Sequence, residues 1–150
     1  MIIVSVSENR DLEKRISITP EISKKYINLG FEVHLSESYG DHLGFKDEEY
    51  KAQGVKITSD ENKLLESADV IIQMSLLNDN KTSVLKPNQT FIGVLNPYEN
   101  KDKLDKLVKK KINLFSLELL PRITRAQSMD ILSSQANLAG YKAVVEAFSV

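Results

Sequence analysis

The side chains able to do chemistry in this chain are of few kinds. The sequence has no cysteine, which excludes disulfides, thiolate nucleophiles and cysteine-ligated metals. Its two histidines, His34 and His42, are too few for a histidine-based metal centre, so we expect no metal site. Polar side chains gather instead after residue 121, where an irregular segment leads into a helical pattern with Asp130, Ser133 and Asn137 on one stripe. What remains are carboxylates, amides and hydroxyls, groups that hold a ligand by hydrogen bonds.

The charge balance gives the chain no general attraction to polyanions. Lys and Arg number 20 against 21 Asp and Glu, a formal net charge of −1. We therefore expect no nucleic-acid partner and no binding to an anionic membrane surface. The opening MIIVSVSENR lacks a basic leader, and no run approaches the roughly 20 apolar residues of a membrane span. These features predict a cytoplasmic protein without direct membrane insertion.

Apolar runs of strand length recur along the chain. Several are dense in Ile, Val, Leu and Phe with little alternation, which is typical of strands covered on both faces. The predicted strands are Ile2–Val6, Phe31–Leu35, Val70–Met74, Phe91–Leu95 and Ile112–Leu117.

The segments between these runs carry helix signals. Thr19 and Pro20 supply a capping hydroxyl and a first-turn proline, and the helix that they begin should stop at Gly30. Asp60 begins a second helix in the same way. A third is expected after Asn96-Pro97, with three apolar side chains facing inward: Leu104, Leu107 and Val108. The alternation predicts a single α/β domain whose mainly parallel sheet has helices on both faces.

The last predicted helix should be much longer than the others. It begins at about Ser128 and reaches residue 150 without a stop signal, which predicts that the chain continues into a further domain. Its alanine-rich stripe suits close packing against a partner: Met129, Leu132, Ala136 and Ala139. Larger apolar groups follow at helical spacing: Tyr141, Val144, Val145 and Phe148. Without a partner, the segment after Gly140 should fray, fold back on the sheet or pair with a second copy.

Two segments carry a resemblance to a known family. PRITRAQSMDILSSQANLAGYKA, residues 121–143, resembles the signature region of the proton-translocating NAD(P) transhydrogenase α subunit, in its NAD(H)-binding component. Glu8 and then EKRISITP, residues 13–20, resemble the opening that this family shares with alanine dehydrogenase. The resemblance implies two Rossmann-like domains with NAD in the cleft between them.

Residues 1–150 would be the first of these domains, with a Rossmann-like or flavodoxin-like sheet. Residues from about 128 to 150 would form an interdomain helix. The second, dinucleotide-binding domain is expected to be absent from this chain, because the phosphate-binding pattern G-x-G-x-x-G occurs nowhere in it.

The resemblance also implies a site. Arg122, Gln127 and Asp130 match the family's Arg-Gln-Asp loop, which is catalytic and contacts the nicotinamide end of NAD. Asp130 would hold Arg122 by an ion pair, and Gln127 would bond a ribose hydroxyl. Ser133, one turn beyond Asp130, would bond the carboxamide. The structural alternative is that Arg122 ends a strand, Gln127 is solvated and Asp130 or Ser128 only starts a helix.

In the family, hydride passes directly from NADH to an NADP(H) cofactor held on another component. That reaction needs two nicotinamides placed face to face and neither a nucleophile nor a metal. The implied partners are the missing dinucleotide-binding domain, the NADP(H)-binding and membrane components, and a second copy in a homodimer. The chain alone would be inactive.

Two alternatives remain open. An amino-acid dehydrogenase like alanine dehydrogenase needs a Lys after the strand at 70–74 and a His after the one at 91–95, where this sequence has Gln73 and Asn96. Gln73 also departs from the transhydrogenase pattern, where a Lys is common. Arg15 matches the Arg that grips the substrate carboxylate in alanine dehydrogenase, and here it either keeps that role or is structural. The other alternative is a non-catalytic α/β module that dimerises through the alanine-rich stripe.

Overall fold

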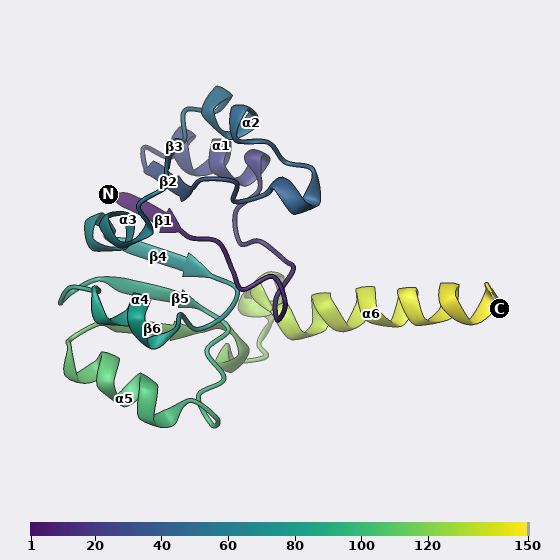
Figure 1. Ribbon diagram of the computed structural model, residues 1–150. Helices are drawn as coiled ribbons and strands as arrows, with labels where there is room; N and C mark the ends of the chain where they lie inside the picture. Colours follow the sequence, from purple (N-terminus) through teal and green to yellow (C-terminus); the bar gives the residue numbers. More distant parts are fainter. Residues whose placement is uncertain (150) are drawn as a thin grey trace.

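Six parallel strands form one sheet in the computed structural model, which describes residues 1–149 (Figure 1). The strands are β1 (Ile2–Ser5), β2 (Glu32–Ser36), β3 (Lys56–Thr58), β4 (Val70–Gln73), β5 (Thr90–Gly93) and β6 (Asn113–Ser116). Their order is β3-β2-β1-β4-β5-β6, and every neighbouring pair runs parallel. The predicted Rossmann-like parallel sheet is confirmed, and all five predicted strands are present. Only β3 escapes prediction, because three residues at the sheet edge give no apolar run.

Six α-helices and three short 3₁₀ helices connect or follow the strands in the described part of the chain. The α-helices are α1 (Pro20–Asn28), α2 (Asp47–Ala52), α3 (Glu61–Ser67), α4 (Asp79–Ser83), α5 (Lys101–Lys109) and α6 (Ile131–Phe148). The 3₁₀ helices are η1 (Asp41–Leu43), η2 (Leu117–Leu119) and η3 (Thr124–Met129). The predicted caps of α1 and α3 are confirmed, since Thr19 accepts from the Ile22 amide at 3.3 Å and Asp60 from the Lys63 amide at 3.1 Å. Prediction missed α2 and α4, whose six and five residues are too few to show a helical period.

Each face of the sheet has its own core, as helices on both faces require. Apolar side chains of the central strands pack on one face with α3 and α5: Val4, Ile71, Phe91, Leu65 and Leu107. On the other face the core is built with α1 and α2: Ile3, Val33, Leu35, Tyr50 and Ile22. The prediction that Val108 also faces inward is wrong, because it is 58% exposed. Leu104 and Leu107 define the buried stripe of α5, and Val108 lies at the edge of that stripe.

The strand order reverses between β1 and β4, which lie side by side although their connections leave in opposite directions. In a parallel sheet the loops after such strands diverge and leave a crevice beyond the carboxyl ends. Residues 7–9 and 75–78 follow these two strands, and they line a hollow at that edge together with Asn96 and Asn100. The segment that leads into α6 also follows from this edge, since it continues from the end of β6.

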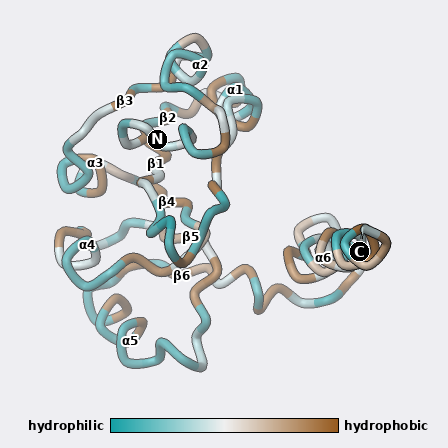
Figure 2. The backbone as a smooth tube through the Cα atoms, turned by 45° about the vertical axis from the view of Figure 1, so that its right-hand side comes forward, coloured by the Kyte–Doolittle hydropathy of each residue, from teal (hydrophilic) through white to brown (hydrophobic). Residues whose placement is uncertain are grey.

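Helix α6 projects away from the rest of the molecule (Figures 1 and 2). Every side chain from Leu132 to Ser149 is exposed, including the apolar ones coloured brown along the helix in Figure 2. The helix begins at Ile131 and not at Ser128 as predicted, because η3 occupies the preceding six residues. It is helical to Phe148 and does not fold back on the sheet, whereas fraying after Gly140 and pairing with a second copy stay predictions. Residue 150, the end of the predicted helix, lies outside the described residues. Among residues 1–149 no helix is both long and apolar enough to cross a membrane.

Candidate functional site

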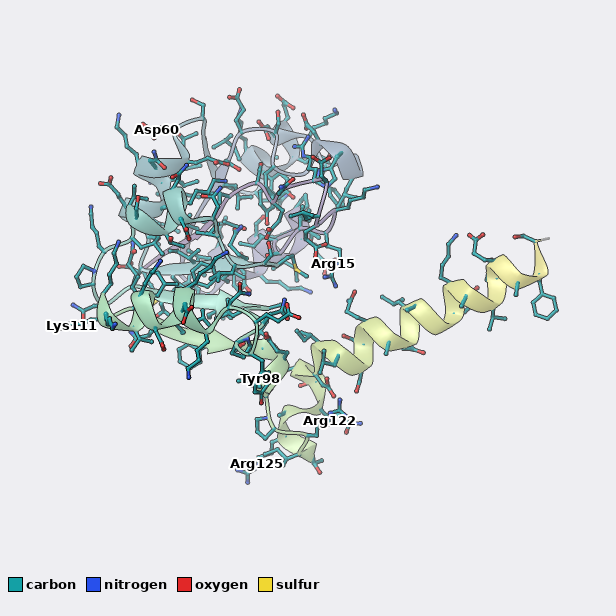
Figure 3. The ribbon with its side chains drawn as sticks, turned by 60° about the horizontal axis from the view of Figure 1, so that its bottom comes forward. Arg15, Asp60, Tyr98, Lys111, Arg122 and Arg125 are labelled. Carbon is teal, nitrogen blue, oxygen red and sulfur yellow. The ribbon has the colours of Figure 1, made fainter. Side chains whose placement is uncertain are left out.

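A hollow at the root of α6 is lined by the four residues that the sequence analysis singles out. Arg122, Gln127, Asp130 and Ser133 share it with Ile123 and Thr124. Two elements create this grouping. The irregular segment after β6 carries Arg122, and the step from η3 to α6 brings Gln127 beside Asp130 and Ser133. In Figure 3, Arg122 lies below the first turns of α6, and Arg125 lies further out on the same segment.

Asp130 fixes the start of α6. Its Oδ1 accepts from the amides of Leu132 at 3.0 Å and Ser133 at 3.1 Å, and its Oδ2 accepts from the Ser133 hydroxyl at 2.7 Å. The bond from the Ser133 hydroxyl is the largest cause of a lowered pKa of Asp130, followed by the bond from the Ser133 amide. A carboxylate at this position caps the free amides of the first turn and complements the helix dipole.

The predicted ion pair between Asp130 and Arg122 is wrong. Within residues 1–149, no Arg122 nitrogen lies within 4.0 Å of a carboxylate oxygen, and Arg122 adds only the smallest of the influences that lower the pKa of Asp130. Asp130 instead accepts three hydrogen bonds from the first turn of α6. The guanidinium is consequently left exposed at the rim of the hollow.

Side chains in the hollow keep donors and acceptors that make no hydrogen bond within the described residues. Gln127 is exposed, and within the described residues its amide side chain makes no hydrogen bond to the protein. The Ser133 hydroxyl gives its proton to Asp130 and keeps its oxygen lone pairs as acceptors. Ala126 is the buried residue of η3, at 6% exposure. The hollow therefore offers a cation, a donor–acceptor amide and a hydroxyl acceptor, and it contains no strong nucleophile.

Gln73 is buried in a polar network at the carboxyl end of β4. It is 2% exposed, and its Oε1 accepts from the Ser5 hydroxyl at 2.7 Å and the Val6 amide at 2.8 Å. Its Nε2 donates to the Val6 carbonyl at 3.1 Å and to Glu8 at 3.2 Å. Glu8 also accepts from the backbone amide of Met74 at 2.6 Å. The sequence marks Gln73 only as a departure from a pattern, and the structure shows that its buried side chain connects β4 to residues 5–8 by hydrogen bonds.

The remaining residues weighed from the sequence lie elsewhere. Arg15 lies beside Glu13, a residue that lines the hollow at the carboxyl ends of β1 and β4, with Nη2 and Oε2 2.6 Å apart, and it also reaches α6. Asn96 is exposed with a left-handed φ of 46°, and its backbone N–H donates to the Glu118 carboxylate at 2.5 Å. Glu118 was missed, because nothing in its spacing relates it to Asn96. Among residues 1–149 no group of three potential metal ligands is found.

Known proteins share the sequence pattern and the fold of this chain. Residues 5–139 match the family described as alanine dehydrogenase/PNT, N-terminal domain. The chain is similar to the first of the parts that make up the NAD(P) transhydrogenase subunit alpha of Rickettsia prowazekii, with 40% identity over 98% of this chain and 39% of that protein. It also resembles the crystal structure of transhydrogenase from Sinorhizobium meliloti, with a TM-score of 0.91 and 35% identity over 98% of this chain and 44% of that one.

A structure of L-alanine dehydrogenase shares the fold at a TM-score of 0.74 and 16% identity, covering 79% of this chain and 32% of that one. The chain thus spans well under half the length of each of these relatives. The family match, by contrast, covers most of the chain. This protein belongs to the alanine dehydrogenase/PNT N-terminal domain family.

Proposed function

We propose that this chain is the first domain of the NAD(H)-binding component of a proton-translocating NAD(P) transhydrogenase. In that role the hollow at the root of α6 holds the nicotinamide end of NAD(H) for direct hydride transfer to NADP. The observation that carries the proposal is the convergence of Arg122, Gln127, Asp130 and Ser133 on one hollow. The relatives of similar sequence named as transhydrogenase subunits support it.

The groups that line the hollow fit the proposed cofactor. The Gln127 amide has both a donor and an acceptor free for a ribose hydroxyl. The Ser133 oxygen can accept from the carboxamide of the nicotinamide, because the Ser133 hydroxyl proton is directed to Asp130. Arg122 offers several donors at the rim. The bound nicotinamide would itself supply the hydride, and the protein would supply orientation and exclusion of water.

The rest of the assembly follows from the same proposal. A second, dinucleotide-binding domain of the subunit would hold the phosphates at the amino end of a helix, because this chain has no glycine-rich turn for them. Residues from about 128 to 150 would lead to that domain. NADP(H) would sit on a separate component, the subunit would form a homodimer, and the complex would be peripheral to the membrane through its membrane component.

An alanine dehydrogenase-like activity is the weaker alternative. Gln73 stands where an amino-acid dehydrogenase needs a Lys, and its amide is committed to Ser5, Val6 and Glu8. Asn96 stands where that enzyme needs a His, and an amide cannot act as its general acid or base.

The substitution Arg122→Ala in the complete protein tests the proposal. Loss of one charge-assisted contact, about 1.5–3 kcal/mol, should slow hydride transfer from NADH to an NADP analogue by about tenfold to hundredfold. The thermal midpoint should hardly move, because Arg122 is exposed. Leu114→Ala is the matched control, since Leu114 packs against the core and its truncation should lower the midpoint by several degrees. An Arg122→Ala protein that unfolds as early as Leu114→Ala would show that Arg122 is structural.

A further inference from the structure

Arg15 joins the loop before α1 to the helix α6, 120 residues further along the chain. Its guanidinium binds Glu13 in a fork, with Nε 2.8 Å from Oε1 and Nη2 2.6 Å from Oε2. The remaining arm, Nη1, donates to the side-chain oxygen of Gln135 at 3.0 Å. Because Glu13 binds one edge of the planar group through both Nε and Nη2, it fixes the direction in which Nη1 points.

Few other contacts hold α6. Only Ile131 at its start is partly buried, and every later side chain is exposed. Within residues 1–149, the one other element with which α6 makes substantial contact is η2. In this part of the chain no buried apolar stripe sets the rotation of α6 about its own axis. The Arg15–Gln135 hydrogen bond is the long-range side-chain contact that does so here.

The position of Gln135 on the helix makes this contact consequential for the hollow. At about 100° per residue, Gln135 lies roughly 200° around the helix from Ser133 and about 140° from Asp130. The helix is therefore held from one side by Arg15 and presents Ser133 and Asp130 on the other. In the view of Figure 3, Arg15 and Arg122 lie on opposite sides of the first turns of α6.

We infer that Arg15 is a positioning residue for the hollow: by holding Gln135 it sets the rotation of α6, and so the direction in which Ser133 and Asp130 face a bound nicotinamide. The inference rests on the proposed function. It assigns Arg15 a role that is neither a grip on a substrate carboxylate nor a contribution to the core. Within residues 1–149 the Arg15 guanidinium uses three of its five N–H donors, two on Glu13 and one on Gln135.

The test measures steady-state hydride transfer by the complete protein with its NADP(H)-binding partner. The variants are Arg15→Ala, Gln135→Ala, the double variant and Gln135→Glu. Each single alanine variant should lower kcat about three- to tenfold, the equivalent of one lost hydrogen bond, and leave KM for NADH within about twofold. The double variant should be no slower than Arg15→Ala, because both changes break the same contact. Gln135→Glu keeps an acceptor oxygen for Arg15 and should retain kcat within about twofold.

One control matches Arg15→Ala in exposure and position. Lys14→Ala removes the neighbouring cation, whose side chain makes no hydrogen bond or ion pair within residues 1–149. This variant should keep kcat. The thermal midpoints of all these variants should stay close to that of the unchanged protein, because exposed ion pairs contribute little to stability. If Arg15→Ala fails to fold, Gln135→Ala decides alone.

The Arg122→Ala variant separates failure of this inference from failure of the proposed function. If Arg122→Ala is slow while Gln135→Ala keeps the kcat of the unchanged protein, Arg15 does not act through α6 and the inference is overturned. A slow Arg15→Ala with an unaffected Gln135→Ala overturns it as well. If Arg122→Ala also keeps its activity, the site itself is misassigned.

Discussion

Replacing Gln73 by Leu should destabilise the protein although the two side chains are close in size. Gln73 partners both the amide and the carbonyl of Val6, a residue that is fully buried. Leucine leaves these two groups unpaired, at about 1–3 kcal/mol each. The Ser5 hydroxyl still has Tyr39, and Glu8 still has Met74, so neither is orphaned.

The gain from burying an apolar side chain, about 1.5–3 kcal/mol, offsets part of that loss. From the middle of these ranges we expect a net loss of about 2 kcal/mol in the free energy of unfolding. At an m-value of about 2 kcal/mol/M, the urea midpoint followed by circular dichroism should fall by about 1 M. Gln135→Leu is the control, since the same change at an exposed position should move the midpoint by less than about 0.3 M. Equal midpoints for the two variants would refute the reasoning that Gln73 is a buried structural link.

Other expectations concern the sheet, a buried tyrosine hydroxyl and the cofactor. Gly93→Ala should lower the free energy of unfolding by about 2 kcal/mol or more, because an added Cβ would lie 2.5 Å from the Gln73 carbonyl oxygen. Gly140→Ala is its control, since an added Cβ there meets nothing within 4 Å and should be neutral or stabilising; equal urea midpoints would contradict this. Tyr50→Phe should cost about 1 kcal/mol, since its hydroxyl donates to the buried Ile18 carbonyl at 3.0 Å, and an unchanged midpoint would argue against that bond. Calorimetric titration of the 150-residue chain with NADH should show no saturation, because the chain has no phosphate-binding turn; a low-micromolar dissociation constant would place a complete site within it.

The sequence predicts the elements of this fold better than its contacts. Dense apolar runs identify β1, β2, β4, β5 and β6 because burial on both faces demands them. The capping residues Thr19 and Asp60 give the starts of α1 and α3, since a cap acts through its nearest neighbours in the chain. Elements of three to six residues, such as β3 and α2, are too short to show a period.

For the candidate site too, the sequence predicts the residues better than their contacts. Its residues were identified through a family resemblance, and the structure brings Arg122, Gln127, Asp130 and Ser133 to one hollow. The sequence leaves two partners open for Asp130, because a carboxylate before a helix can cap the helix or pair with a nearby cation, and the geometry selects the cap. The contact of Arg15 with Gln135 joins residues 120 positions apart, and no local pattern in the sequence encodes it.

A crystal structure of the complete protein with bound NADH tests the central claim most directly. We expect the nicotinamide end to lie in the hollow at the root of α6, with its carboxamide and ribose within hydrogen-bond distance of Ser133, Gln127 or Arg122. A nicotinamide seated instead in the crevice between β1 and β4, against Ser7 and Ser75, would contradict the proposed site.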